Sequence, residues 1–198
     1  MSDTSLAQKQ QIRKELRDKV ANLPAMFREQ AAARACALLQ NQTVWQNARS
    51  IFFYAPLPSE LNIWALVPEV MKMKKIILLP KFDPETNSYL PFQIQNLEND
   101  LFPGKFGVHE PNGSCSSYPL KQLDLTLVPA LAFDLSGNRL GRGRGFYDKL
   151  LADVSGAKCG VAFDEQIIKQ VPVEPHDVPV DYLLTPTQWI PVADAKPE

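Results

Sequence analysis

The sequence predicts an α/β fold, a three-layer sandwich whose largely parallel central sheet is covered by helices on both faces. Two short runs, 51–54 and 76–79, are hydrophobic at every position, which is typical of strands buried on both faces. Segments with helical character precede each run, so helices and strands alternate along the chain. With 198 residues, 45% of them hydrophobic, the chain can bury one sizeable core and requires no second one. We therefore expect a single domain over residues 1–198, with a frayed tail at about 192–198.

Helical patterns dominate the N-terminal part of the chain. Ile12, Leu16 and Val20 recur at every fourth position, which predicts an amphipathic helix over residues 5–21. An alanine-rich helix is expected over residues 24–39. A further helix is expected over about 62–75, between the two hydrophobic runs.

The expected strands follow from hydrophobic runs and from the residues that interrupt them. Prolines end the first strand, at residues 50–55, and the second, at 76–79. The alternating segment 89–95 reads as an exposed or antiparallel strand, and 123–133 is the strongest strand pattern. The rest of the chain then reads as a turn at 134–138, a helix ending at about 153, a strand at 159–163, a short helix at 165–170 and a strand at 182–184.

Composition excludes several functional classes. The net charge of -1 is spread over segments of mixed sign, so neither a nucleic-acid-binding face nor an acidic tail is expected. No apolar run reaches transmembrane length and no signal peptide is visible, so we expect a cytoplasmic protein without a membrane partner. The sequence also predicts reduced thiols without catalytic duty and no zinc site, because no histidine lies near any of the widely spaced Cys36, Cys115 and Cys159.

The most informative segment is 138–148, with the sequence NRLGRGRGFYD. Its glycines let backbone N–H groups approach an anion, and Arg142 and Arg144 supply cationic donors at the start of a helix. Asp148, one turn into that helix, is placed to hold a phosphate-bound Mg²⁺. The pattern therefore indicates a polyphosphate site. A glycine-rich turn with solvated arginines is the alternative that the loop alone leaves open.

This glycine loop matches neither familiar nucleotide-binding motif. A P-loop requires G-K-[ST] before its helix, and the corresponding place here is Gly145-Phe146. A Rossmann fingerprint directly follows its strand, whereas here the turn at 134–138 intervenes. The phosphate-binding physics applies, but fold analogy with those motifs does not.

Taken with its flanks, the loop resembles the signature of the 5-formyltetrahydrofolate cyclo-ligases, also called 5,10-methenyltetrahydrofolate synthetases. The matching segments occur in the expected order: Lys9-x-x-x-Arg13, Tyr54 to Glu60, Leu79-Pro80-Lys81, Val128 to Asp148, and Pro172 to Asp177. The resemblance implies an α/β sandwich and a reaction that depends on ATP and Mg²⁺. In that reaction ATP phosphorylates the formyl oxygen of 5-formyltetrahydrofolate. The folate N10 then closes the ring and phosphate leaves, which gives 5,10-methenyltetrahydrofolate, ADP and phosphate.

The resemblance also implies the site residues. Arg142 and Arg144 are the implied catalytic residues, and Asp148 and Asp177 are the implied magnesium ligands. The implied ATP-binding residues are Lys9, Arg13, Arg139, Leu140, Gly141, Arg142, Gly143, Arg144, Gly145, Phe146 and Tyr147. The implied folate-binding residues are Arg13, Tyr54, Glu60, Arg142, Gly143, Arg144, Gly145 and Phe146. The implied partners are ATP and 5-formyltetrahydrofolate, and we expect a monomer.

Several of these residues have an ordinary alternative role. Lys9 and Arg13 border an apolar stripe and read otherwise as solvated charges. Asp177 reads otherwise as a turn residue, and Glu60 as an exposed loop acid. Lys81, at a strand end, is a further candidate for a phosphate contact. The aromatic candidates for stacking on a pterin or adenine ring are Trp64, Phe102, Phe106 and Phe146.

Two alternatives to this function remain open on sequence. A nucleotide-binding regulatory module would keep the phosphate loop without turnover, although it has less need of two metal carboxylates. A phosphosugar isomerase or an acyl-CoA transferase on a related sheet would need a catalytic glutamate or lysine base, which we cannot place in the sequence.

Overall fold

The computed structural model describes residues 3–104 and 107–192, with side chains from residue 7 onward. The aromatic candidate Phe106 and tail residues 193–198 lie outside this range. A seven-stranded sheet has the order β11-β10-β9-β6-β1-β2-β3, parallel from β10 to β2 and antiparallel at both edges. Its strands are β1 (Ser50–Phe52), β2 (Ile76–Asp83), β3 (Ser88–Ile94), β6 (Leu125–Pro129), β9 (Ala157–Val161), β10 (Tyr182–Leu184) and β11 (Trp189–Pro191).

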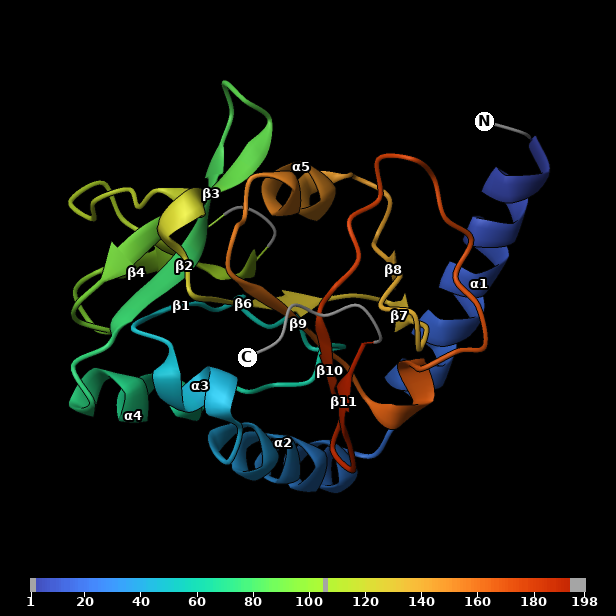
Figure 1. The fold of residues 1–198 in the computed structure, drawn as a ribbon, viewed down its shortest axis with the longest axis horizontal. Helices are drawn as coiled ribbons and strands as arrows, with labels where there is room; N and C mark the ends of the chain where they lie inside the picture. The colour runs from blue at the N-terminus through green and yellow to red at the C-terminus, as the bar shows by residue number, and fades with distance from the viewer. Residues whose placement is uncertain (1–2, 105–106, 193–198) are drawn as a thin grey trace.

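Helices cover both faces of this sheet, as Figure 1 shows. One face carries α2 (Ala25–Gln40), α3 (Thr43–Asn47) and α4 (Leu66–Lys72), and the other carries α5 (Phe146–Ala152). Helix α1 (Asp3–Ala21) lies at one end of the molecule, beside the small sheet formed by β7 (Ala132–Phe133) and β8 (Arg139–Leu140). The predicted three-layer α/β sandwich is therefore confirmed.

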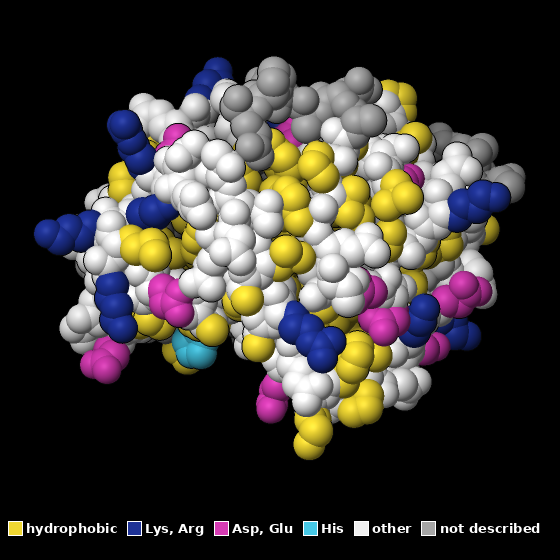
Figure 2. Space-filling view, turned by 60° about the horizontal axis from the view of Figure 1, so that its bottom comes forward, with side chains coloured by type: hydrophobic (Ala, Val, Ile, Leu, Met, Phe, Trp, Pro, Cys, Tyr) yellow, Lys and Arg dark blue, Asp and Glu magenta, His cyan; other side chains and the backbone are white. Residues whose placement is uncertain are grey.

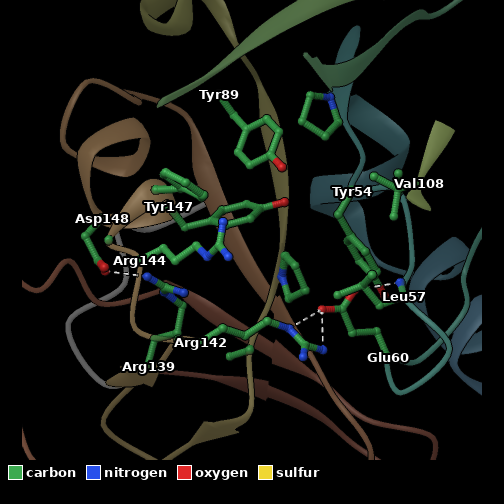
Figure 3. Close-up of a pocket in the computed structure, with 17 residues that line it drawn as sticks. Tyr54, Leu57, Glu60, Tyr89, Val108, Arg139, Arg142, Arg144, Tyr147 and Asp148 are labelled. Atoms are coloured by element: carbon green, nitrogen blue, oxygen red, sulfur yellow. Dashed lines mark hydrogen bonds and ion pairs between the residues drawn. The ribbon is translucent and has the colours of Figure 1, made fainter. Parts of the chain in front are cut away.

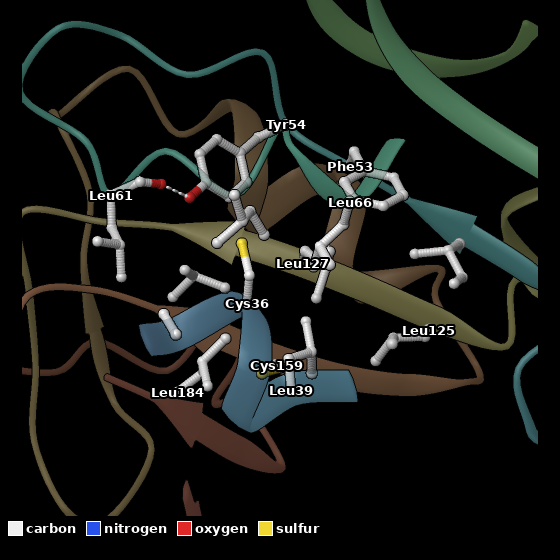
Figure 4. Close-up of a cluster of buried hydrophobic side chains, with 14 of the residues drawn as sticks. Cys36, Leu39, Phe53, Tyr54, Leu61, Leu66, Leu125, Leu127, Cys159 and Leu184 are labelled. Atoms are coloured by element: carbon white, nitrogen blue, oxygen red, sulfur yellow. Dashed lines mark hydrogen bonds between the residues drawn. The ribbon is translucent and has the colours of Figure 1, made fainter. Parts of the chain in front are cut away.

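Alternation along the strands builds the core on both faces. In β1 and its extension, Ile51 and Phe53 belong to the cluster beneath α2 and α4, whereas Phe52 belongs to the cluster beneath α5. This division is what full burial of a period-two strand requires. Figure 4 shows Cys36 of α2 and Cys159 of β9 within the first cluster. Burial is the main cause that raises the pKa of the Cys36 thiol to about 11, and the Glu69 charge adds a smaller increase.

Strand β2 corrects the prediction that Pro80 ends it. β2 continues to Asp83 and pairs antiparallel with β3, with Pro80 opposite Pro91. Beyond Leu78, β2 has no further register partner in β1. Proline is tolerated where a backbone N–H is not needed by a neighbouring strand. The prediction of an antiparallel strand at about 89–95 is confirmed as β3.

Other predicted boundaries also change. The first strand ends at Phe52, the helix expected over 62–75 spans only 66–72, and the short helix expected at 165–170 is a 3-10 turn, η3 (Asp164–Gln166). The strand expected over 123–133 is divided between β6 and β7 (Ala132–Phe133), and β7 pairs with β8 (Arg139–Leu140). Elements that the sequence analysis missed include α3, β8, β11, β4 (Leu101–Pro103), β5 (His109–Pro111) and η2 (Leu120–Gln122).

The turn at 134–138 is confirmed, and a buried carboxylate organises it. Asp134 accepts hydrogen bonds from the backbone N–H groups of Ser136, Asn138 and Val171. Val192 is not frayed as predicted, since it is buried and its N–H donates to the Asp181 carbonyl.

Charged side chains of both signs are interspersed with scattered hydrophobic ones on the face drawn in Figure 2. None of the helices in the described part of the chain combines the length and apolar character needed to cross a bilayer.

Candidate active site

The residues of the glycine loop line a cavity of about 290 Å³, which we call the loop cavity. It opens at the carboxyl edge of the parallel strands, since its wall includes Ala55 after β1, Pro129 at the end of β6, and Pro80, which lies in β2 beyond its parallel pairing with β1. Ligand sites in parallel α/β sheets lie outside the carboxyl ends of the strands. Figure 3 shows the arginines at one end of the cavity and Glu60, Leu57 and Val108 toward the other.

Arg139 and Asp148 form an ion pair that joins β8 to the first turn of α5. The Arg139 side chain is only 4% exposed, and its guanidinium lies 5.7 Å from the centre of the Tyr147 ring. A Cβ atom at Gly141 would lie 2.8 Å from Arg139 Nη1, so a side chain at this position would displace the guanidinium. The glycine loop is therefore wrapped closely around one buried guanidinium.

Positive backbone angles then turn the loop into α5. Gly143 and Gly145 have φ values of 96° and 67°, in the region that side chains of L-residues disfavour. Gly145 is the N-cap of α5 and Phe146 its first residue. Arg142 and Arg144, which flank Gly143, are exposed and line the cavity.

Arg142 bridges the cavity to Glu60. Its Nε and Nη2 atoms lie 3.2 and 3.1 Å from Glu60 Oε1, and Nη2 also donates to Ser59 Oγ at 3.0 Å. The other carboxylate oxygen of Glu60 accepts the backbone N–H of Leu57 at 2.9 Å. The Glu60 side chain is only 8% exposed, so the alternative of an exposed loop acid is wrong. Glu60 is a held carboxylate that offers acceptor atoms at the cavity wall.

Two tyrosines, the buried Tyr54 and the half-buried Tyr147, contribute differently to the wall. Tyr54 donates its hydroxyl hydrogen to the Leu61 carbonyl, so its ring, rather than its hydroxyl, is the part available to a ligand. Burial raises the pKa of Tyr54 well above its usual range, and the Glu60 charge adds to this effect. Burial likewise raises the pKa of Tyr147, with the Glu60 charge again raising it and Arg139 lowering it. Both groups are neutral in the working protein.

An aromatic cluster holds the start of α5 against the β2–β3 hairpin. The rings of Phe82, Tyr89 and Phe146 meet edge to face, with centroids 5.4 to 5.7 Å apart. Such pairs contribute about 0.5–1.5 kcal/mol each beyond their burial. Burial and the Glu110 charge raise the pKa of Tyr89 to about 12. In Figure 3 the Tyr89 side chain points toward the cavity from the wall opposite Glu60.

Helix α1 contacts the glycine loop through Arg13. Arg13 Nε donates to the Gly141 carbonyl at 3.0 Å. Lys9, which is only 7% exposed, lies 3.2 Å from Glu174 and 3.4 Å from Asp177. Beneath them Leu16 packs with Leu140 of β8. The alternative of solvated surface charges is therefore wrong for both cations, and α1 is tied to the loop by polar contacts as well as by packing.

The structure gathers most, but not all, of the predicted residues in the loop cavity. Those that line it are Tyr54, Glu60, Arg139, Gly141, Arg142, Arg144, Gly145, Phe146, Tyr147 and Asp148. Those outside its wall are Lys9, Arg13, Leu140, Gly143 and Asp177. Lys81 is also outside, because its Nζ donates to the Asn112 carbonyl at 3.1 Å. Phe102 is 40% exposed on β4 and does not line the cavity either.

The two predicted magnesium ligands lie in different surroundings. Asp148 lines the cavity beside Arg139, whereas Asp177 is paired with Lys9 and accepts the Glu174 N–H at 2.8 Å. Within the described residues, no group of three or more His, Cys, Asp or Glu side chains is arranged to hold a metal ion. A phosphate-bound Mg²⁺ requires fewer protein ligands than that. Of the two predicted ligands, Asp148 alone faces the cavity, where it could contact such an ion.

Comparison with protein families decides the classification. Residues 5–186 match the model of the 5-formyltetrahydrofolate cyclo-ligase family. The chain belongs to this family. It is similar to the 5-formyltetrahydrofolate cyclo-ligase of Haemophilus influenzae, with 34% identity over 87% of this chain and 94% of the relative. It is also similar to the 5-formyltetrahydrofolate cyclo-ligase of Mus musculus, with 30% identity over 89% of this chain and 92% of the relative.

A solved structure supports the same classification. The NMR structure of Aquifex aeolicus 5,10-methenyltetrahydrofolate synthetase matches with a TM-score of 0.85 and 32% identity, covering 96% of this chain and 95% of that one. The family and the enzyme class predicted from the sequence are therefore confirmed.

Some cavity residues were not predicted for this cyclo-ligase family member. Tyr89 lies in a segment that was interpreted only as a strand, and Val108 lies in a segment without a clear pattern. Ala130 follows the strongest strand and was interpreted as part of it. The sequence did hold a signal for Ala130, because residues that follow the strands of a parallel sheet share one edge and therefore lie near a ligand site. The signal for Tyr89 was absent, since it depends on the fold of the β2–β3 hairpin.

Proposed function

We propose that this protein catalyses the ATP-dependent cyclisation of 5-formyltetrahydrofolate to 5,10-methenyltetrahydrofolate, with release of ADP and phosphate. The observation that carries the proposal is the division of the loop cavity. One end offers the guanidinium groups of Arg142 and Arg144 and the carboxylate of Asp148, and the other offers aromatic and aliphatic walls with the single carboxylate of Glu60. A polyphosphate and a flat heterocycle with N–H donors suit these two ends.

The chemistry requires activation of a poor leaving group. The formyl oxygen of the substrate takes the γ-phosphoryl group of ATP, and ADP leaves. N10 then attacks the formyl carbon, and the C–O bond to phosphate breaks as the ring closes. The protein's task is positioning and charge stabilisation on the transferring phosphoryl group.

The loop residues supply that stabilisation. Arg142 and Arg144 would bind the phosphoryl oxygens, and Arg139 would hold the Asp148 carboxylate in place through its ion pair. Asp148 would hold Mg²⁺, which neutralises phosphate charge when bound. Asp177 remains a proposed second ligand that would first have to leave Lys9.

Glu60 is the proposed receptor for the pterin ring. Its Oε1 atom is held by Arg142 before substrates bind, so substrate entry exchanges this ion pair for contacts with both substrates. Arg142 is then free to contact phosphate, and Glu60 to accept the N–H donors of the pterin. Arg13 and Lys9 would act from outside the cavity by fixing the loop through Gly141 and the 174–177 segment.

The test is direct. The methenyl product is a conjugated amidinium, so its near-ultraviolet absorbance reports turnover. We expect absorbance to grow only when ATP, a divalent metal and 5-formyltetrahydrofolate are all present, with ADP released in equal amount. Equal growth without ATP or without metal would refute the proposal. Nucleotide binding without turnover would instead favour a regulatory module.

A further inference from the structure

Asp134 is a buried carboxylate outside the loop cavity, and it makes more contacts than its own turn requires. One of its oxygens, Oδ1, accepts the backbone N–H groups of Ser136 and Asn138, both at 3.0 Å. The other oxygen, Oδ2, accepts the Asn138 amide at 3.1 Å and the backbone N–H of Val171 at 2.9 Å. One oxygen therefore shapes the turn, and the other also reaches a residue 37 positions further along the chain.

The contact with Val171 explains why this position holds an aspartate. An asparagine offers one acceptor oxygen, which is sufficient for the two backbone N–H groups of the turn. Its amide NH₂ group would then face the N–H of Val171, and neither donor would have an acceptor. Buried donors without partners are costly. The second carboxylate oxygen of Asp134 is therefore needed for the distant contact rather than for the turn.

The segment that receives this contact has no regular structure to hold it in place. Residues 171–180 contain neither helix nor strand. Hydrogen bonds at both ends of the segment fasten it to the turn instead, since Val171 donates to Asp134 and the Val180 N–H donates to the Gly137 carbonyl at 2.9 Å. Figure 1 shows this orange-red segment running beside α1. The turn therefore determines where the segment lies against the helix.

The contacts of this segment close a ring that includes the glycine loop. Its carboxylates Glu174 and Asp177 lie 3.2 and 3.4 Å from Lys9 of α1. From the same helix, Arg13 donates to the Gly141 carbonyl at 3.0 Å. Gly141 directly follows β8, and β8 begins where the turn at 134–138 ends. The ring thus runs from the turn through the segment, α1 and the glycine loop back to the turn.

An apolar cluster is the other link between these elements. It contains Leu16 of α1, Leu140 of β8 and Val171. Apolar packing is not directional, whereas a hydrogen bond requires a defined distance and angle. The cluster can therefore hold the elements together, but the polar ring is better suited to fix the position of the loop.

We propose that Asp134 is a positioning residue for the glycine loop. It acts through residues 171–180 and helix α1, and it holds the loop in the form that receives the phosphates of ATP. This inference rests on the proposed function, because ATP is the ligand that the proposed function assigns to the loop.

The first measurement is equilibrium binding of the non-hydrolysable ATP analogue AMP-PNP with Mg²⁺, by titration calorimetry. Asp134→Asn keeps an acceptor for the turn and breaks the link to Val171, so we expect the Kd to rise about three- to tenfold. Arg13→Ala breaks the same ring elsewhere. The double variant should therefore raise the Kd no more than about twofold beyond the larger single effect. An unchanged Kd in Asp134→Asn, or single effects that multiply in the double variant, would overturn the inference.

Hydrogen exchange distinguishes positioning of the loop from a local role in the turn. In Asp134→Asn we expect faster amide exchange in residues 171–180 and in α1, while β6 and β9 stay protected. Faster exchange confined to the turn would count against the inference. If the amide variant does not fold, Asp134→Ser repeats both measurements, because its hydroxyl can accept from the turn and places no NH₂ group against Val171.

Asp100→Asn is the matched control. Asp100 is a half-buried aspartate whose Oδ2 accepts the N–H groups of Gln95 and Asn96 at 2.7 and 2.8 Å, and it does not line the loop cavity. Its Kd for AMP-PNP should stay within about twofold of wild type. Wild-type protein that binds AMP-PNP but does not cyclise the folate would defeat the proposed reaction alone. Wild-type protein that binds no AMP-PNP would defeat this inference as well.

Discussion

At the scale of single residues, the three arginines of the glycine loop have different duties. Arg139 is buried and paired with Asp148, whereas Arg142 and Arg144 are exposed at the cavity. A buried guanidinium that has lost its partner is costly, so Arg139 serves first to hold the loop and α5 together. In the proposed reaction, the charge for an incoming phosphate would therefore come from Arg142 and Arg144.

Arg144→Ala should impair phosphoryl transfer more than folding. Arg144 lies outside the buried core, and losing one charge-assisted contact in the transition state is expected to cost about 2–4 kcal/mol in kcat/KM. The measurements are steady-state kinetics and the melting temperature. Arg34→Ala, which removes an exposed arginine of α2, is the control. A kcat/KM within about threefold of wild type would make Arg144 a surface charge only.

Asp148→Asn should affect both metal dependence and stability. The substitution removes an anionic metal ligand, so the magnesium concentration for half-maximal activity should rise. It also leaves the buried Arg139 guanidinium without its counter-charge, so the melting temperature should fall by several degrees. A purely structural role would lower the melting temperature and leave the magnesium titration unchanged.

The sequence predicted residue types better than residue contacts. The glycine spacing and the arginines at 139–145 were sufficient to predict an anion site in the loop, and the structure shows that most residues of this loop line a cavity. The pairing of Arg142 with Glu60 joins positions 82 residues apart, and no local pattern contains such a contact. Lys9 was predicted to bind ATP, but the structure places it outside the loop cavity, between Glu174 and Asp177, and this position depends on how the 174–177 segment folds back onto α1.

At the scale of elements, α1 acts as a brace for the glycine loop. It packs through Leu16 on Leu140 of β8 and donates from Arg13 to the Gly141 carbonyl. Burial, and then the Arg17 charge, lower the pKa of the Arg13 guanidinium. The nearby charges of Asp177 and Glu174 oppose this shift but do not cancel it. The guanidinium stays protonated, because its ordinary value is far above neutral pH.

Arg13→Ala should loosen the loop without unfolding the α/β core. We expect the KM for ATP or folate to rise about three- to tenfold, because one hydrogen bond that positions the loop is lost. Lys14→Ala, an exposed neighbour on the same helix, is the matched control. Deletion of residues 1–14 should abolish activity while circular dichroism retains the folded signal. Wild-type KM values for both substrates in Arg13→Ala would reduce α1 to packing only.

The elements predicted from sequence were those with a clear period. Helices α1 and α2 and the buried strands of the parallel sheet have apolar positions at regular spacing. Strands β7 and β8 are two residues long, so neither can show a period, and their pairing is set by the Asp134 turn. Helix α4 begins later than predicted because the Asn62 side chain accepts the backbone N–H of Trp64. This hydrogen bond holds residues 62–64 in a turn instead of a helix.

At the scale of the whole molecule, sheet topology explains why distant segments share a site. Parallel strands place their carboxyl ends at one edge, so Ala55 after β1, Pro80 of β2 and Pro129 at the end of β6 meet there with the glycine loop. The same topology buries polar and ionisable groups in the core beside the site. Tyr54, Cys36 and Cys159 are buried and Tyr147 is half-buried, and burial raises the pKa of each.

These buried groups predict that the protein loses stability at alkaline pH. The folded-state pKa of each is above its unfolded value, so the unfolded chain releases these protons first as the pH rises. The stabilisation is complete below the unfolded pKa and is lost as the pH rises through the folded pKa. For Cys36 this window runs from 9.0 to about 11. The corresponding loss for this thiol is at most about 3 kcal/mol.

Cys36→Ala should therefore make the alkaline decline shallower. Cys36 lies in the cluster between α2 and the sheet, so its removal also leaves a small cavity and lowers stability at neutral pH. The informative quantity is the slope of unfolding free energy against pH, measured by denaturant titration between about pH 7 and 10.5. Ile51→Val removes one methyl group from the same cluster and no titratable group, so it should retain the wild-type slope. An identical slope for Cys36→Ala and wild type would show that the Cys36 thiol does not contribute to the alkaline transition, which would then have to come from the buried tyrosines and Cys159.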